Sequence, residues 1–413
     1  MCGIVGYVGE RDCTEVLLDA LSKLEYRGYD SAGIAVFEKD RIMVEKSKGE
    51  LKNLREKINK EHKPDGHCGI GHTRWATHGE PSDINSHPHG SKRVSIVHNG
   101  IIENYKDIKN FLIGKGYTFI SETDTETVAK LLDYYYEGDP VEAIIKTLND
   151  IRGAYALGIL FKDFPDRIFA VRKDSPLIIG VGEEENFIAS DVPAILKYTR
   201  NVYYIGNLEF AKLTPGEAHF YNLDGDEIEK ETTEIKWDAE AAEKAGFEHF
   251  MMKEIHEQPK AIQDTLNSVI KEDKIDLSTV EIADEEIQNF DQIYIVACGS
   301  AWHVGMAAQY VFEDLADIPV RVELASEFRY RKMPLNQKAL VIVVSQSGET
   351  ADTLAALRMA KEKNITTMAI VNVVGSSIAR EADKVFYTLA GPEISVATTK
   401  AYSAQLAAMY CLA

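Results

Sequence analysis

The first part of the chain alternates short apolar runs with turns rich in glycine and asparagine. Runs of this length that are rich in β-branched residues are typical of strands. We expect strands at residues 3–8, 33–37, 41–46, 94–98, 155–161, 167–172, 187–189, 202–205 and 218–221. Apolar residues at helical spacing interrupt them over 13–24 and 125–136. The pattern therefore predicts an α+β domain, mostly antiparallel, up to residue 222.

Beyond residue 246 the pattern becomes strand, loop of small residues, helix, several times over. Apolar runs occupy residues 293–297, 320–324, 339–344, 366–371 and 384–390, and helical patterns begin near 302, 326, 350 and 398. Strands that are apolar throughout and alternate with helices indicate a parallel sheet covered on both faces. We therefore predict a doubly wound α/β domain, in which ligands bind at the carboxyl ends of the strands.

The stretch between these two patterns, residues 223–246, is charged and contains few large apolar side chains. Such a composition is typical of an exposed connector between domains. A chain of 413 residues is long enough for two domains of ordinary size. We therefore expect one domain over 1–222, a linker over 223–246 and a second domain over 247–413.

The charge of the chain excludes several classes of partner. With 46 basic and 66 acidic residues, the formal net charge is −20, so the surface as a whole repels nucleic acid and anionic membranes. The longest apolar runs are far shorter than the ~20 residues that span a bilayer. The N-terminus lacks the basic and apolar regions of a secretory signal, so we expect a cytoplasmic protein without membrane or nucleic-acid partners.

Cysteine and histidine spacing argues against a metal centre. The five cysteines are widely spaced and include no Cys-x-x-Cys pair, which disfavours a disulfide framework and a zinc site. Histidines do gather in one region, at positions 67, 72, 78, 87 and 89, but their spacing is irregular. We interpret them as loop residues of an active site or as solvated side chains, and expect no metal and no cofactor.

The sequence MCGIVGY places a cysteine directly behind the initiator methionine. Methionine is commonly removed before a small residue, and its removal would make Cys2 the first residue. The thiol would then stand beside a free α-amine, whose ordinary pKa near 8 suits a general base at neutral pH. Cys2 is therefore a candidate nucleophile, with an incidental cysteine before a buried strand as the alternative.

Three further groups supply what an acyl-transfer site requires. Arg74 offers a guanidinium for a substrate carboxylate, and Asp124 an anion for a substrate ammonium group. The side-chain amide of Asn99 and the backbone N–H of Gly100 form a donor pair that suits an oxyanion hole. Each has a structural alternative: a surface ion pair for Arg74, a hairpin turn for Asn99 and Gly100, and a helix start for Asp124.

Five motifs of the first half resemble the class II glutamine amidotransferases of the N-terminal nucleophile type. They are, in order, MCGIVGY, YRGYDSAG, HTRWATHG, HNGIIENY and SETDTE. The resemblance implies a sandwich of helices around two sheets (αββα), with glutamine as the nitrogen donor. It implies that Cys2 attacks the glutamine side-chain amide while Asn99 and Gly100 stabilise the oxyanion. It further implies a glutamine pocket and mobile loop formed by Arg27, Arg74, Trp75, Thr77, His78 and Asp124.

The second half contains SQSGET between a predicted strand and a predicted helix. Hydroxyl groups and backbone N–H groups at a helix N-terminus bind phosphate without any net positive charge. A polar loop with no ligand is the alternative. The chain contains no G-x-G-x-x-G motif and no P-loop lysine, which disfavours a dinucleotide or a nucleoside triphosphate.

Several motifs of the second half together resemble a sugar-isomerase domain. They are HFMMKEIHEQP, ACGSAWHVG, SQSGET and GPEISVATTKAY. Joined to the glutaminase half, they resemble the family of glutamine–fructose-6-phosphate aminotransferases. The resemblance implies that fructose 6-phosphate is bound by Ser300, Ser345, Gln346, Ser347, Thr350 and Thr398. Where the family commonly has Cys-Gly-Thr-Ser, this chain has Ala301 in the last position, so we expect no polar role there.

The family resemblance also implies a longer protein. Its members carry a second sugar-isomerase domain and a tail that holds the acid–base residues of the isomerisation, so we expect this chain to be a fragment. We also expect a homodimer formed through the sugar-isomerase domains. Two alternatives remain: a phosphoribosyl amidotransferase, which needs an acidic loop absent from the second half, and a sugar-phosphate sensor or binding fragment without complete synthase activity.

Overall fold

The structure, a computed structural model, describes residues 2–235, 244–272, 274–332 and 334–413. The expected removal of Met1 and part of the expected linker, 236–243, lie outside the described residues. The side chain of Arg27 is also outside them, so its contact with glutamine stays a prediction. The chain divides between residues 236 and 237 into two compact units, which are described separately below.

Two antiparallel sheets form the centre of the first unit. Among the described residues, the first sheet has the order β15 (Thr233–Glu234), β11 (Asn201–Tyr204), β9 (Ile178–Val181), β10 (Asn186–Ala189), β1 (Gly3–Val8), β4 (Cys68–Arg74), β2 (Ser31–Glu38) and β3 (Arg41–Lys48). The second has the order β14 (Glu227–Ile228), β13 (Ala218–Tyr221), β12 (Glu209–Leu213), β8 (Ile168–Lys173), β7 (Gly153–Phe161), β6 (Val94–Ile102) and β5 (His89–Gly90).

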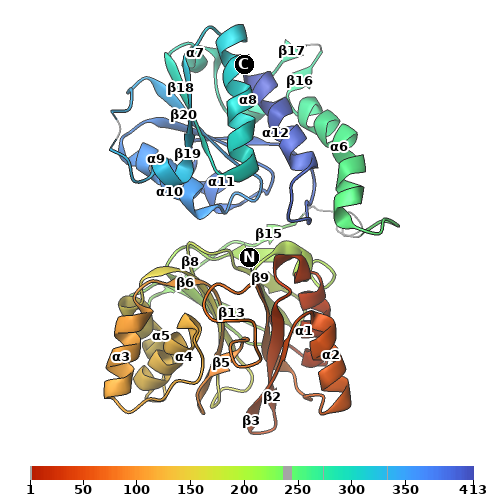
Figure 1. Ribbon diagram of the computed structural model, residues 1–413, viewed down its shortest axis with the longest axis vertical. Helices are drawn as coiled ribbons and strands as arrows, with labels where there is room; N and C mark the ends of the chain where they lie inside the picture. The colour runs from red at the N-terminus through yellow and green to blue at the C-terminus, as the bar shows by residue number, and fades with distance from the viewer. Residues whose placement is uncertain (1, 236–243, 273, 333) are drawn as a thin grey trace. The chain divides into compact units, whose positions relative to one another are not determined.

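Helices cover the outer face of each sheet (Figure 1). The first sheet carries α1 (Cys13–Ser22) and α2 (Leu51–Lys60), and the second carries α3 (Tyr105–Gly114), α4 (Asp124–Tyr135) and α5 (Pro140–Asp150). Short 3-10 turns occupy Glu25–Arg27 and Val192–Ala194. Apolar side chains of both sheets, such as Ile70 of β4 and Val97 of β6, form one core between them. The predicted αββα sandwich is therefore confirmed.

The second unit contains a parallel sheet with the order β19 (Val320–Leu324), β18 (Gln292–Ala297), β20 (Ala339–Ser345), β21 (Thr366–Val371) and β22 (Lys384–Tyr387). A separate hairpin of β16 (Ile270–Lys271) and β17 (Lys274–Ile275) lies before it. Side chains of β18 alternate between two cores: Ile293 and Ile295 enter one, and Tyr294 and Val296 the other. Both faces of this sheet are therefore buried.

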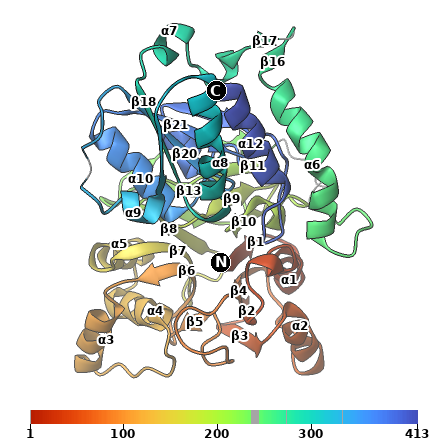
Figure 2. The same ribbon diagram turned by 45° about the horizontal axis from the view of Figure 1, so that its top comes forward.

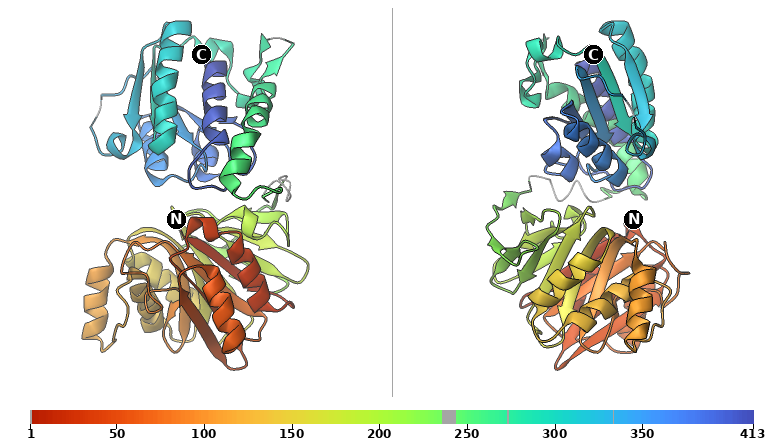
Figure 3. Two further views of the ribbon diagram at one scale, coloured as in Figure 1. Left: turned by 45° about the vertical axis from the view of Figure 1, so that its right-hand side comes forward. Right: turned by 90° about the vertical axis from the view of Figure 1, so that its left-hand side faces the viewer.

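Helices on both faces make this second unit doubly wound, as predicted (Figures 2 and 3). One face is covered by α8 (Gly299–Leu315) and α12 (Lys400–Leu412), with α6 (Phe250–Asn267) packed on α12. The other carries α9 (Ala325–Phe328), α10 (Ala351–Glu362) and α11 (Ser377–Glu381). A 3-10 turn at Leu277–Val280 and α7 (Asp284–Ile287) precede β18.

The structure differs from two expectations about local structure. Asn99 and Gly100 lie inside β6 and pair with β7, so the hairpin interpretation is wrong. Strands β14 and β15 fall inside the stretch interpreted as a connector, because each adds to the edge of a sheet in the first unit. In the described part of the chain, no helix has the length and apolar character needed to cross a membrane.

Candidate active site

Cys2 lies directly before β1, opposite the end of β4. Because Gly3 pairs with Thr73 in the antiparallel ladder, the residue before β1 faces the residues that end β4. The backbone N–H of Trp75 donates to the Cys2 sulfur at 3.2 Å, and this sulfur lies 3.4 Å from the Trp75 carbonyl oxygen. The thiol is partly buried. It is thus held against the main chain while one side of it can be reached by a substrate.

The YRGYDSAG motif shapes the turn that follows β4. A Cβ atom on Gly28 would lie 2.6 Å from the carbonyl carbon of Arg74 and 2.7 Å from the nitrogen of Trp75, so a larger residue would push this turn away. The backbone N–H of Asp30 donates to the Arg74 carbonyl at 3.0 Å. Its carboxylate accepts from the N–H of Ala76 at 2.8 Å. The motif therefore places the backbone that contacts the thiol.

Arg74 ends β4 and is buried, with 3% of its surface exposed. Its guanidinium donates to the carbonyl oxygens of His78, Gly79 at 3.1 Å and Glu80 at 3.4 Å. The alternative of a surface ion pair is therefore wrong. Arg74 instead carries a buried positive charge and ties the loop after the HTRWATHG motif to the end of the strand.

The electrostatic surroundings of Arg74 connect the predicted site residues. Burial lowers the pKa of Arg74, and the nearby groups of Cys2, Asp30 and Asp124 act in the opposite direction. The interactions show that the thiol, the guanidinium and the Asp124 carboxylate share one neighbourhood. A substrate with a carboxylate and an ammonium group would meet opposite charges there.

The remaining pocket residues of the first unit lie on the loop beyond Arg74. Trp75 is 43% exposed and packs edge-on against Tyr29, with 5.6 Å between ring centroids. Thr77 is exposed, and His78 packs edge-on against Tyr105 at 5.5 Å. An exposed loop that carries the rings of Trp75 and His78 is suited to cover a small substrate.

Asn99 and Gly100 are neighbours on β6, and the side chain of Asn99 reaches Cys2. The Asn99 side-chain nitrogen donates to the Cys2 carbonyl oxygen at 3.0 Å. Gly100 has φ +121, and a Cβ atom there would lie 2.0 Å from the Ala154 carbonyl oxygen on β7. Only glycine fits this close strand pairing. The Asn99 amide therefore lies beside Cys2 on a rigid strand, and the Gly100 N–H stays a predicted donor.

His72 of β4 fixes the orientation of the Asn99 amide. Its Nε2 lies 3.0 Å from the Asn99 side-chain oxygen and 3.0 Å from the His98 carbonyl oxygen. Both are acceptors, so Nε2 carries the proton of the neutral ring. Burial lowers the pKa of His72 to about 3, which keeps the ring neutral. With its oxygen bound to His72, Asn99 presents its nitrogen to Cys2.

Three more histidines surround this ring. His87 stacks on His72 with 4.1 Å between centroids, and it accepts from the backbone N–H of His98 at 3.2 Å. His98 and His89 bond to hydroxyls of α4 and its N-cap. Burial lowers the pKa of His87, His89 and His98. In the described part of the chain, no group of His, Cys, Asp and Glu side chains is arranged to hold a metal.

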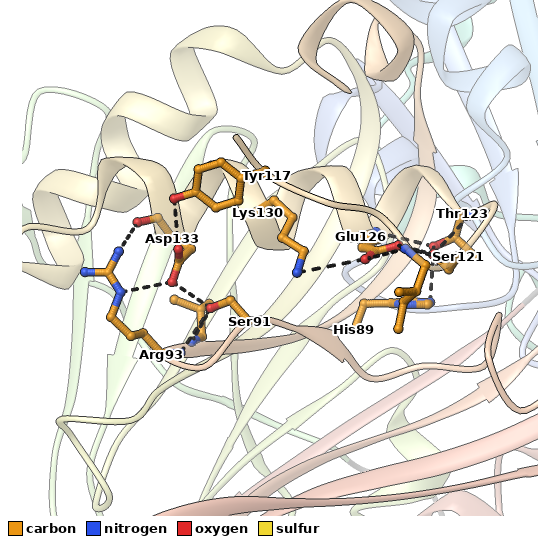
Figure 4. Close-up of polar contacts among 11 residues, drawn as sticks. His89, Ser91, Arg93, Tyr117, Ser121, Thr123, Glu126, Lys130 and Asp133 are labelled. Atoms are coloured by element: carbon orange, nitrogen blue, oxygen red, sulfur yellow. Dashed lines mark hydrogen bonds and ion pairs between the residues drawn. The ribbon is translucent and has the colours of Figure 1, made fainter. Parts of the chain in front are cut away.

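The SETDTE motif builds the start of α4 and so places Asp124. Thr123 caps the helix by accepting from the Glu126 N–H at 3.3 Å, and the Glu126 carboxylate accepts from the Ser121 N–H at 2.7 Å (Figure 4). Asp124 is the first helical residue and is 5% exposed. One of its oxygens accepts from the Ile102 N–H at 2.8 Å, at the end of β6. Asp124 can therefore begin the helix and also bind a substrate ammonium group, so the two interpretations are compatible.

In the second unit, the SQSGET loop joins β20 to α10. Ser345 ends the strand; its hydroxyl accepts from the Gly348 N–H at 3.1 Å and lies 2.9 Å from the Thr350 hydroxyl. The Ser347 hydroxyl accepts from the Glu349 N–H at 3.2 Å. The loop therefore gathers hydroxyl groups in front of the N-terminus of a twelve-residue helix. This arrangement suits a phosphate group.

The other predicted sugar-phosphate residues follow neighbouring strands. Ser300 lies in the first turn of α8 after β18, and its neighbour Ala301 packs into the core. Thr398 precedes α12 on the segment after β22, where its hydroxyl donates to Glu393 at 2.7 Å. Since the strands are parallel, these groups and the SQSGET loop share the carboxyl edge of the sheet. Lys400 is paired with Glu257 of α6 at 2.7 Å.

The structure thus brings Cys2, Arg74, Asn99 and Asp124 to one place in the first unit. Two residues of the same place were not singled out from the sequence. Asp30 lies inside a recognised motif, but its contact with the turn after β4 depends on a fold that brings distant segments together. His72 was grouped with other histidines, and only the three-dimensional partners reveal its tautomer and its bond to Asn99.

Family models match both units of the chain. A glutamine amidotransferase domain matches residues 72–197, and a SIS domain matches residues 286–413. Among solved structures, glutamine phosphoribosylpyrophosphate amidotransferase from B. subtilis aligns over 94% of this chain and 90% of its own, with 16% identity and a TM-score of 0.50. At that identity the likeness concerns the fold alone.

Curated relatives match the whole chain at much higher identity. Proteins named glutamine–fructose-6-phosphate aminotransferase [isomerizing] are 58% identical in Caldanaerobacter subterraneus subsp. tengcongensis and 57% identical in Clostridium acetobutylicum. The protein of the same name in Aquifex aeolicus is 48% identical. In each comparison all of this chain aligns, and it spans 68% of the first two relatives and 69% of the third.

Proposed function

Because the chain belongs to the family of glutamine–fructose-6-phosphate aminotransferases, we propose that Cys2 releases ammonia from glutamine and that this ammonia is transferred to fructose 6-phosphate. The products are glutamate and glucosamine 6-phosphate. The placement of the Asn99 amide 3.0 Å from the Cys2 carbonyl, beside a thiol held by Trp75, is the observation that carries the glutaminase half.

In the first step, the Cys2 thiol attacks the side-chain amide carbon of glutamine. The free α-amine of Cys2 takes the thiol proton once Met1 has been removed. The oxyanion that forms is stabilised by the Asn99 amide and the Gly100 N–H, as in other acyl transfers. The amine then passes a proton to the leaving nitrogen, so ammonia departs and a glutamyl thioester remains.

Water next hydrolyses the thioester and releases glutamate, which restores the thiol. Throughout these steps Arg74 binds the α-carboxylate of glutamine and Asp124 binds its α-ammonium group. Trp75, Thr77 and His78 close over the substrate, and Arg27 contributes to the same pocket. Fixing both charged ends of glutamine holds the amide carbon near the sulfur, which lowers the entropic part of the barrier.

In the second unit, Ser345, Gln346, Ser347 and Thr350 bind the phosphate of fructose 6-phosphate. Ser300 and Thr398 complete this pocket from neighbouring loops. Ammonia condenses with the ketone carbon and expels water, and isomerisation of the imine then gives the amino aldose phosphate. The overall reaction therefore transfers the amide nitrogen of glutamine to the sugar. The water consumed in thioester hydrolysis is balanced by the water released in imine formation.

Three further proposals concern the domain bounds, the oligomeric state and the location of the protein. We assign residues 1–222 to the glutaminase domain and 247–413 to the sugar-isomerase domain; within the connecting stretch 223–246, β14 and β15 extend the sheets of the first unit. The parallel-sheet units pair to form a homodimer, as the family resemblance implies. The cytoplasm is the proposed location, because both substrates, a sugar phosphate and an amino acid, are metabolites of that compartment.

The deciding experiment supplies glutamine together with fructose 6-phosphate or with 5-phosphoribosyl diphosphate, and measures glutamate and phosphorylated amino sugar separately. We expect glutamate release in both cases, and any phosphorylated amino sugar that forms should be glucosamine 6-phosphate. Consumption of the diphosphate sugar would favour the phosphoribosyl amidotransferase alternative. Cys2→Ala should abolish glutamate release, and substantial residual hydrolysis in that variant would contradict the assignment.

A further inference from the structure

The two segments predicted to bind the sugar phosphate do not follow adjacent strands. The SQSGET loop follows β20, and the segment with Thr398 follows β22, while β21 lies between these strands in the sheet. The first residue after β21 is Asn372, which is 4% exposed. It is therefore placed between the two segments at the carboxyl edge of the sheet.

Asn372 makes hydrogen bonds to both segments. Its backbone N–H donates to the Gln346 carbonyl oxygen at 3.1 Å, on the SQSGET loop. Its side-chain nitrogen donates to the Gly391 carbonyl oxygen at 2.7 Å. Its side-chain oxygen accepts from the Ala390 N–H at 2.8 Å and from the Thr388 hydroxyl at 3.2 Å. One buried residue thus joins the two loops, with its backbone N–H on the SQSGET loop and its side-chain amide on the segment after β22.

The chain after Asn372 holds the same loop a second time. The Ile378 N–H donates to the Gly348 carbonyl oxygen at 3.0 Å, and the Ser377 N–H donates to the Glu349 carboxylate at 2.7 Å. Gly348 has φ +64, and a Cβ atom there would lie 1.9 Å from the Ser376 hydroxyl oxygen. The SQSGET loop is therefore clamped along its length by the segment that Asn372 begins.

We propose that Asn372 is a positioning residue, which fixes the phosphate-binding loop relative to the segment after β22 so that both contact one sugar phosphate. This role rests on the proposed function of those two loops. The backbone N–H holds the SQSGET loop, and holding the segment after β22 requires a side chain that donates and accepts at once. An aspartate would retain the acceptor but turn a carboxylate oxygen toward the Gly391 carbonyl, and a buried repulsion of that kind separates the loops.

The test compares Asn372→Asp with Asn289→Asp in the 413-residue chain. Asn289 is exposed and donates to the Glu285 carbonyl oxygen within one helical turn, so its substitution is a matched control. Fructose 6-phosphate and inorganic phosphate are titrated separately at millimolar concentrations, with binding followed by ligand-observed NMR. Glutamine hydrolysis reports whether the first unit stays intact.

We expect Asn372→Asp to weaken fructose 6-phosphate binding about tenfold or more, with a smaller effect on inorganic phosphate. Inorganic phosphate needs only the SQSGET loop, whereas the sugar phosphate needs both segments. Asn289→Asp should change neither, and glutamine hydrolysis should be unaffected in both variants. Equal fructose 6-phosphate affinity in Asn372→Asp and wild type would overturn the inference, as would equal losses for the two ligands.

Hydrogen exchange separates this inference from the proposed function. In Asn372→Asp and in Asn372→Ala, amide exchange should rise in both 345–350 and 388–391, while β18 and β20 keep their protection. Unchanged exchange in 388–391 would contradict the bridge. A wild-type chain that binds neither ligand, yet shows the coupled exchange, would contradict the proposed binding site rather than the bridge.

Discussion

The side-chain nitrogen of Asn99 lies 3.0 Å from the carbonyl oxygen of Cys2. A side chain on the second sheet is thereby fixed beside Cys2, the proposed nucleophile, which directly precedes the first strand of the first sheet. In the proposed reaction, an amide held this way needs no reorganisation when charge develops on the substrate, which is the condition for effective oxyanion stabilisation.

Replacing Asn99 should affect the chemical step more than substrate binding. Removing one oxyanion donor typically lowers kcat about 10²- to 10³-fold. For Asn99→Ala we expect a loss of that size in the kcat of glutamine hydrolysis, with KM changed only a few-fold. Steady-state kinetics of glutamate release measure both. A large rise in KM with kcat preserved would place Asn99 in substrate binding instead.

His72 should act through Asn99. His72→Leu removes the donor that fixes the amide, so we expect kcat to fall about tenfold or more, while His72→Gln keeps a donor nitrogen and restores most of the rate. In an Asn99→Ala background the same His72→Leu change should cost little. Additive losses in the double variant would show that His72 only stabilises the fold.

The charged ends of glutamine should be recognised by Arg74 and Asp124. A buried charge-assisted hydrogen bond contributes roughly 1.5–3 kcal/mol, so Arg74→Ala and Asp124→Asn should raise KM about ten- to a hundredfold. Arg74→Lys keeps the charge but not the forked donors that hold the loop carbonyls, and should lie between wild type and alanine. Normal glutamine affinity in Arg74→Ala and Asp124→Asn would show that the pocket is misplaced.

Gly100 should tolerate no side chain. In Gly100→Ala the new Cβ would meet the Ala154 carbonyl at 2.0 Å, in a backbone conformation that disfavours L residues. We expect a lower Tm together with strongly reduced glutamine hydrolysis. Gly114→Ala is the matched control, since nothing lies within 4 Å of its Cβ position. Equal effects of the two substitutions would contradict the strand geometry around Gly100.

The stability of the first unit should depend on pH through its buried histidines. Burial lowers the pKa of His72 to about 3 and also lowers those of His87, His89 and His98. The unfolded chain therefore binds more protons than the folded one below about pH 6.5, so unfolding becomes easier as pH falls. We expect the Tm of this unit to drop between pH 7.5 and 5.

The variant His87→Phe provides the control for this pH dependence. It removes one buried imidazole and should make the change of Tm with pH shallower, whatever its effect on Tm at pH 7.5. The measurement is a thermal melt followed at several pH values. A slope equal to that of the wild type would show that other groups dominate the proton linkage.

Much of the fold could be predicted because its local pattern is strong. The predicted strand bounds at β1, β13, β19 and β21 agree with the structure. The conformation of the Asn-Gly pair of β6 could not be predicted from the sequence. This dipeptide is a local signal for a turn, and that signal competes with pairing to β7, which only the tertiary fold supplies. Helix α8 begins at Gly299 rather than near Trp302, because small residues of its first turn carry no apolar periodicity.

The sequence allowed the candidate site residues to be identified, but it did not allow their contacts to be predicted. Cys2 and Arg74 stand out through their chemistry and motifs, yet the bonds of Arg74 to the loop carbonyls depend on how that loop folds back. The tautomer of His72 depends on two acceptors from another strand. Asn372 lies in none of the motifs of the sequence, and its proposed role follows only from the loops that it contacts on either side of β21.

The central claim is that Cys2 is the nucleophile that attacks glutamine. A glutamine analogue with a diazoketone in place of the amide should alkylate that group, and peptide mass mapping locates the adduct. We predict one adduct on Cys2 at a free N-terminus without Met1, with complete loss of glutamine hydrolysis and no adduct in Cys2→Ala. An adduct on Cys13, Cys68, Cys298 or Cys411 that accompanies the loss of activity, or full activity with Cys2 alkylated, would contradict the account.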